Sequence, residues 1–113
     1  MSEFQKRLVR DGYCDERGAA FCATATKLPG GERGMVLLCV KGNMLNIHDV
    51  DMRNNVKDLI YQVELKKVKQ LKIRMMLLSQ VLKFEYNGAI FSFTNFLKVR
   101  PALDVIEEES QKL

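Results

Sequence analysis

The side chains that could carry chemistry are few and far apart in this sequence. The three cysteines are Cys14, Cys22 and Cys39, none of them in a CxxC pair, and the one histidine is His48. A zinc site takes four ligands, usually at short and regular spacings, so this set predicts no metal site. Unpaired cysteines are typical of a reducing compartment. We therefore expect a cytoplasmic protein in which Cys22 and Cys39 are small core or sheet-face residues.

Sequence motifs of enzymes are also missing. The chain has no GxSxG, no Walker-type glycine loop and no HExxH, and no acid or nucleophile is evident as a partner of His48. Residues 29–34 (Pro-Gly-Gly-Glu-Arg-Gly) are rich in glycine, but they lack the lysine and hydroxyl residue that hold a phosphate and its metal. We expect a flexible loop there, and a protein without catalytic activity or a cofactor.

Charge and hydropathy bear on the class of partner. The net charge is +4, which permits an anionic partner without requiring one. A basic cluster alternates with apolar residues, as on the solvated face of a sheet, and no aromatic side chains are interleaved with it for stacking on bases. Nucleic acid is therefore not an expected partner. The basic cluster consists of Lys66, Lys67, Lys69, Lys72 and Arg74.

The apolar runs 35–40 and 75–78 are too short to span a bilayer, and the first residues lack the apolar core of a signal peptide.

The strongest structural signal is a hairpin over residues 81–94. Asn87-Gly88 in its middle is typical of a type I′ turn, in which both central residues take a positive φ. With that turn, Phe84 faces Phe91 and Leu82 faces Phe93, so the apolar side chains share one face. Ile90 is the apolar residue that falls on the polar face.

Period-two alternation predicts the remaining strands. The first follows Gly18 and covers residues 19–28, and Gly42-Asn43 joins residues 35–41 and 44–49 in a hairpin with a type II′ turn. Two further strands follow, with a turn at Lys66-Lys67 between them. Their expected core-facing residues are Leu59, Tyr61, Val63 and Leu65 in one strand and Leu71, Ile73 and Met75 in the other.

A helix is expected near each end of the chain. Ser2 is a good N-cap for a short amphipathic helix up to Arg10. Towards the other end, Asn95 is a candidate N-cap for a helix over residues 96–113. Pro101 cannot donate to an upstream carbonyl, so it must lie in the first turn of a helix or start a new one. The apolar stripe of this second helix consists of Val99, Leu103 and Ile106, and its solvated side is expected to hold Glu107, Glu108 and Glu109.

Seven antiparallel strands and an amphipathic C-terminal helix predict one all-β domain, in which two near-orthogonal sheets form a roll that the helix caps at one end. The residues that carry this pattern are 27–39, 42–49, 63–73, 82–93 and the closing helix. In this pattern the chain resembles the pleckstrin-homology (PH) superfold, and more narrowly the small bacterial PH-like and GRAM-like domains. The resemblance covers residues 18–113, after an N-terminal segment over residues 1–17.

The resemblance implies a binding or adaptor module, and it implies where an anion would bind. PH domains that bind phosphoinositides hold the phosphates at the loop between their first two strands. The matching basic residues here are Lys27 and Arg33, with Arg53 and Lys57 on the adjacent loop. Each basic residue near an anionic membrane is worth about 1 kcal/mol, so these four imply weak, salt-sensitive binding.

A protein partner, or a second copy of the chain, is the favoured expectation. PH-like domains often bind peptides along a sheet edge or on helix and sheet faces. Alternation places four apolar residues on the outer faces of the sheets, where they would form an exposed patch. An N-terminal helix, through Phe4 and Leu8, is the alternative cover for this patch. The four residues are Leu37, Cys39, Ile60 and Ile90.

Overall fold

The computed structural model of the protein describes residues 1–95 and 99–113. Over these ranges the chain forms one antiparallel sheet of seven strands, in the spatial order β4-β3-β2-β1-β7-β6-β5. The predicted seven-stranded antiparallel fold with a C-terminal helix and a short N-terminal helix is confirmed. The elements are α1 (Glu3–Arg10), β1 (Ala20–Lys27), β2 (Gly34–Lys41), β3 (Met44–Val50), β4 (Val56–Glu64), the short 3-10 helix η1 (Leu65–Lys67), β5 (Lys69–Met75), β6 (Gln80–Tyr86), β7 (Ala89–Asn95) and α2 (Arg100–Ser110).

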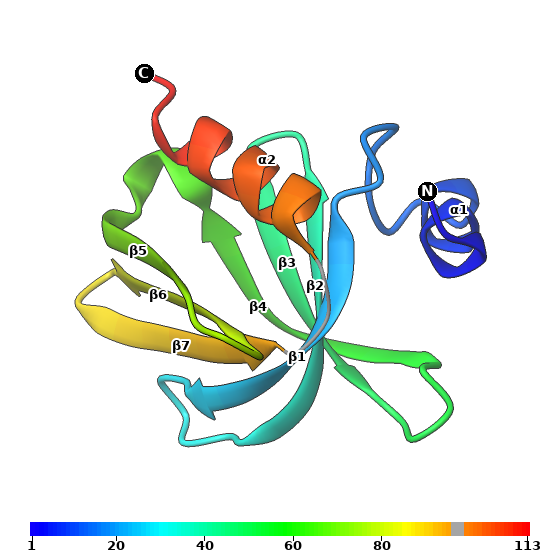
Figure 1. The fold of residues 1–113 in the computed structure, drawn as a ribbon, viewed down its shortest axis with the longest axis horizontal. Coiled ribbons are helices and arrows are strands. Elements are labelled where there is room, and N and C mark those ends of the chain that lie inside the picture. Colours follow the sequence, from blue (N-terminus) through cyan, green and yellow to red (C-terminus); the bar gives the residue numbers. More distant parts are fainter. Residues whose placement is uncertain (96–98) are drawn as a thin grey trace.

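The two predicted sheets are the two halves of a single curled sheet. β1 joins them because it pairs with β2 on one side and with β7 on the other. In Figure 1, β6 and β7 run mainly from side to side, whereas β2 and β3 run mainly from top to bottom. The β1–β7 pairing shifts register between Ala25 and Lys27. Such a bulge bends a strand and increases its twist, which lets one sheet turn back over itself.

Both predicted tight turns are present with the predicted register. Asn87 and Gly88 have φ values of 52° and 80°, as a type I′ turn requires. Phe84 pairs with Phe91 across that hairpin. In the other hairpin Gly42 has a φ of 62°, as the first central residue of a type II′ turn must, and the strands on either side of it pair as predicted.

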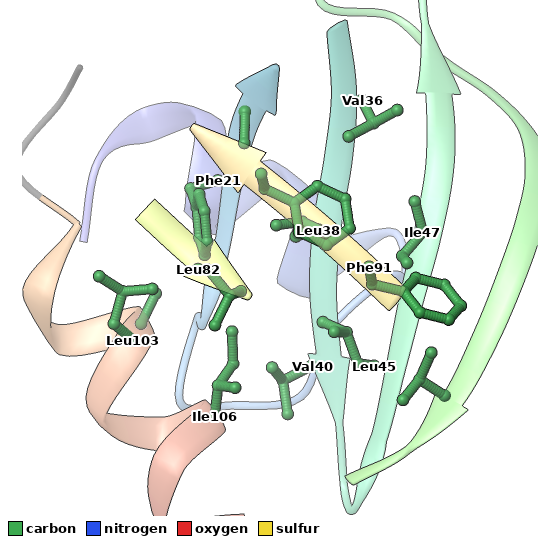
Figure 2. Close-up of a cluster of buried hydrophobic side chains, with 14 of the residues drawn as sticks. Phe21, Val36, Leu38, Val40, Leu45, Ile47, Leu82, Phe91, Leu103 and Ile106 are labelled. Atoms are coloured by element: carbon green, nitrogen blue, oxygen red, sulfur yellow. The ribbon is translucent and has the colours of Figure 1, made fainter. Parts of the chain in front are cut away.

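The main core fills the inside of the curled sheet, and α2 closes one end of it (Figure 1). Figure 2 shows side chains from β1, β2, β3, β6, β7 and α2 pointing into this common interior. Leu103 and Ile106 are the buried contribution of α2, as their spacing predicts. Phe84 and Phe91 stack with ring centroids 5.0 Å apart. The core therefore ties both halves of the sheet to the C-terminal helix.

A second, smaller cluster lies on the outer face of the sheet, beneath α1. Ser2 caps this helix: its hydroxyl accepts the N–H of Gln5 (3.1 Å), and the Gln5 side chain accepts the N–H of Ser2 (2.8 Å). Leu8 is the buried residue of α1. The buried members of this outer cluster are Leu8, Cys14, Ala20, Leu37, Cys39 and Val50.

The alternation predicted for β4 and for the end of β5 is wrong at three residues. Leu59 is exposed and Ile60 packs against the main core, the reverse of the prediction. The cause is a bulge: Ile47 pairs with Tyr61 and His48 with Leu59, which leaves Ile60 as an extra residue. Met75 is also exposed, because it is the last residue of β5 at the sheet end.

The start of the second helix differs from the prediction. α2 begins at Arg100, with Val99 in the N-cap position and Pro101 in the first turn as expected. Asn95 is not its cap: it ends β7, and its side-chain amide donates to the carbonyl oxygen of Cys22 (2.8 Å). Residues 96–98 of the predicted helix lie outside the described residues. At the other end Glu109 is buried, where the solvated side of the helix was expected.

Candidate functional site

The predicted anion-binding loop, between β1 and β2, is held by Tyr61 from β4. The Tyr61 hydroxyl accepts the backbone N–H of Gly30 (2.9 Å) and donates to the Glu32 carboxylate (2.7 Å). The hydrogen bond from Tyr61 lowers the pKa of Glu32. Lys27 and Arg33 are both exposed near this carboxylate in the chain. Lys27 ends β1, and Arg33 follows Glu32 directly in the sequence, so an anion at this loop would also meet a carboxylate.

Arg53 lies in the segment between β3 and β4, whereas Lys57 is the second residue of β4, so the prediction that both stand on the same loop is wrong for Lys57. Hydrogen bonds from Asn55, and then from the N–H of Arg53, lower the pKa of Asp51 to about 2. The Lys57 ammonium lies 3.7 Å from this Asp51 carboxylate. The Arg53 side chain instead lines a shallow hollow of about 430 Å³ beside α1, into which neither Lys27 nor Arg33 extends. The four predicted cations are therefore divided among three places.

The expectation that Leu37 and Cys39 are exposed is wrong. Both side chains are 0% exposed, because α1 covers the outer face of β2 where they lie. Ile60 packs against the main core through the bulge in β4, and Ile90 is half-buried on β7. The alternative cover through Phe4 and Leu8 is the one that the structure has. The four residues do not form an exposed apolar patch.

Apolar exposure is concentrated instead at the turn between β5 and β6. We call Met75, Met76, Leu77 and Leu78 the hairpin tip. Their exposed fractions are 55%, 60%, 96% and 79%. The sequence signal for this tip was available: four apolar residues stand where a hairpin turn normally has glycine, asparagine or other polar residues.

Three cations lie beside the hairpin tip on the outer face of β5 and β6. Lys72 pairs with Lys83 across the two strands, and Arg74 pairs with Val81 two residues nearer the tip. We call Lys72, Arg74 and Lys83 the basic face. Together with Met76, Val81 and Ser92 these cations line one hollow of about 310 Å³. The alternation along β5 predicted that Lys72 and Arg74 point outward, but sequence reasoning did not connect them with the tip.

A network of charged groups joins the N-terminal segment to α2, away from the tip. Glu109 accepts hydrogen bonds from Arg17 (2.7 Å), Lys112 (2.6 Å) and the Asn43 side chain (3.2 Å). The Arg17 guanidinium also binds Asp15 (2.7 Å). Each of these groups has a partner among the described residues, so the burial of Glu109 needs no ligand to explain it.

The histidine and the thiols likewise have packing roles. The ring of His48 meets Tyr13 edge-on at 5.4 Å, and its Nδ1 lies 3.3 Å from the Lys57 carbonyl oxygen. Burial raises the pKa of Cys39 to about 12, which keeps this thiol protonated and unreactive. Within the described residues, no group of three His, Cys, Asp or Glu side chains is arranged to hold a metal ion.

No protein-family model matches this chain, and a search of curated proteins found no similar sequence. In residues 1–95 and 99–113, neither helix has the length and apolar character needed to cross a membrane.

Proposed function

We propose that this chain is a non-enzymatic binding module of the PH-like kind, close to the small bacterial PH-like and GRAM-like domains. The order of its strands and the helix that closes one end of the sheet are compatible with that superfold. Its free cysteines suit the reducing cytoplasm, which belongs to the same proposal. The fold alone does not determine what such a module binds, which depends on the side chains of its surface.

The observation that carries the proposal is the exposure of the hairpin tip. Runs of consecutive exposed apolar residues are disfavoured on a soluble domain unless they have a function, because they cost solubility and promote association. Leu77 and Leu78 are among the most exposed large apolar residues of the chain. Burial of these two side chains by a partner would contribute hydrophobic free energy to binding, because folding leaves them exposed to water.

The sequence predicted two other binding surfaces. A protein partner or self-association was expected through an outer sheet face, but α1 covers Leu37 and Cys39 there. Membrane binding was expected through Lys27, Arg33, Arg53 and Lys57. The hairpin tip is a separate surface that suits a protein or a membrane as the partner. Binding through this tip is the function that we propose.

The proposal can be tested by photo-crosslinking in cells. A photoreactive amino acid replaces Leu77 in one variant and Met52 in another, because Met52 is equally exposed but lies between charged neighbours on the β3–β4 connection. We expect crosslinks to a protein or to lipid from position 77 and few from position 52. Equal yields at the two positions, or none at either, would contradict a binding role for the tip.

A further inference from the structure

The geometry of the β5–β6 hairpin puts its two leucines at the apex. The last pair in the strand register is Met75 with Gln80, and the Met76 N–H donates to the Ser79 carbonyl oxygen (2.8 Å) to close the turn. Leu77 and Leu78 lie beyond this closure and are the most exposed residues of the tip. They can therefore enter an apolar phase without any opening of the domain.

The basic face stands just behind the apex. A strand rises about 3.3 Å per residue, so Arg74 lies roughly 7 Å and Lys72 roughly 13 Å behind Met76 along β5. Amphipathic elements that bind at a membrane interface bury their apolar side to a depth of about 5–10 Å. At that depth of the tip, Arg74 meets the lipid phosphates, and the long side chains of Lys72 and Lys83 reach towards them.

The charges on this face are not matched from within the domain. Lys72 stands directly opposite Lys83, and like charges in that position destabilise a sheet. Among the described residues, Lys72, Arg74 and Lys83 form none of the ion pairs found in this structure. Glu85 lies on the same face, two residues from Lys83 along β6 and opposite Lys69 in the register, and among the described residues it takes part in none of these ion pairs either. An anionic surface beyond the tip would balance the three cations.

We propose that the hairpin tip inserts into the interface of an anionic lipid bilayer, with Lys72, Arg74 and Lys83 at the level of the lipid phosphates. This inference rests on the proposed function and deepens it by naming the partner. A stable protein interface buries about 800 Å² on each partner, which is more than the side chains of one turn supply by themselves. A bilayer needs only the apolar tip and the cations around it.

The first test is binding to vesicles of phosphatidylcholine, alone or mixed with phosphatidylglycerol. The intact chain should pellet with the mixed vesicles and not with the neutral ones, and high salt should release it because it screens the charges. Each cation near an anionic surface is worth about fivefold in partitioning, so Lys72→Gln, Arg74→Gln and Lys83→Gln together should weaken binding about a hundredfold. Leu77→Ser and Leu78→Ser should each weaken it about tenfold.

A matched variant separates this site from charge in general. Lys27→Gln, Arg33→Gln and Lys57→Gln together remove as many positive charges from other segments, and we expect them to weaken binding far less. A larger loss from these three than from the basic face would move the membrane contact to the β1–β2 loop and overturn the assignment. Equal losses from both triple variants would mean that net charge alone drives the binding.

A fluorescent probe reports insertion directly, since the chain has no tryptophan. Leu77→Trp introduces one at the apex, and Met52→Trp introduces the control on the β3–β4 connection. We expect a blue shift and quenching by brominated lipid for Leu77→Trp with mixed vesicles, and neither for Met52→Trp. No shift and no pelleting would overturn the bilayer as partner. Protein crosslinks specific to position 77 would then leave the proposed binding function standing with a protein as the partner, whereas their absence would remove both proposals.

Discussion

Arg17 and Glu109, far apart in the sequence, form an ion pair in which the guanidinium Nη1 donates to the carboxylate Oε2 at 2.7 Å. The carboxylate lies at the end of α2, and Arg17 lies in the connection between α1 and β1. The same guanidinium donates to the carbonyl oxygen of Gly42 in the β2–β3 turn (2.9 Å). One side chain thereby fastens the C-terminal helix to the sheet.

Replacing Glu109 by Gln should destabilise the domain by about 1–3 kcal/mol, because the charged hydrogen bonds to Arg17 and Lys112 are lost at a buried position. Urea unfolding at neutral pH measures the change. Glu108→Gln, at the exposed neighbouring position, is the matched control and should have little effect. Equal effects of the two substitutions would contradict a structural role for the network.

The same network predicts acid sensitivity. Hydrogen bonds from Lys112, Arg17 and Asn43 lower the pKa of Glu109 to about 2, and those from Arg17 hold the pKa of Asp15 well below its usual range. The folded state therefore binds fewer protons than the unfolded state, so this stabilisation is complete above the ordinary carboxyl pKa and lost as the pH falls towards about 2. The urea midpoint should drop over that range, and less steeply in Glu109→Gln. A midpoint that stays constant in acid would exclude this contribution.

Phe84→Ala should cost about 3–5 kcal/mol, because the ring is buried in the main core and stacks on Phe91. Thermal melting or urea unfolding measures the loss. Lys83→Ala, at the neighbouring exposed position of the same strand, should change stability by less than about 0.5 kcal/mol. A negligible effect of Phe84→Ala would mean that the register of the β6–β7 hairpin is wrong.

Leu8→Ala should expose the thiol of Cys39 to labelling. Leu8 is the buried residue of α1, and loss of its packing weakens the helix against β2 and favours its local detachment. In a chain that keeps Cys39 as its sole cysteine, we expect a labelling rate at least about tenfold higher, since each Leu→Ala change at a buried site costs about 2–5 kcal/mol. Leu59→Ala, at an exposed leucine outside this cluster, is the control. An unchanged rate in Leu8→Ala would show that α1 is not what protects the thiol.

Leu77→Ser and Leu78→Ser should leave the stability of the domain unchanged within about 0.5 kcal/mol each, because exposed side chains contribute little to folding. Urea midpoints check this. Leu38→Ser, in the main core, should be strongly destabilising by comparison. A large loss from the tip substitutions would mean that the tip packs against the domain, and its exposure would then need no partner.

Much of the fold could be predicted because its signals are local. Asn87, Gly88 and Gly42 take the positive φ values that their tight turns need, and each turn sets the register of the two strands that it joins. The capping function of Ser2 and the position of Pro101 in the first turn of α2 follow equally from neighbouring residues.

The errors have a common cause in long-range structure. The bulge at Ile60 depends on how β4 pairs with β3, and this pairing reverses the inside and outside of Leu59 and Ile60. The burial of Glu109 depends on Arg17 and Asn43, which approach it only in the folded chain. Alternation and helical periodicity describe one element at a time and contain no information about either contact.

The sequence by itself determined the strands, their tight turns and the apolar character of residues 75–78, since those properties depend on neighbouring residues. Only the tertiary structure decided that α1 covers Leu37 and Cys39, and that the basic face stands behind an exposed apex. The physical reason is that exposure is a property of the packed whole. A run of four apolar residues has the same sequence pattern in a core strand and at a hairpin tip. Only the elements around the run determine whether water reaches it.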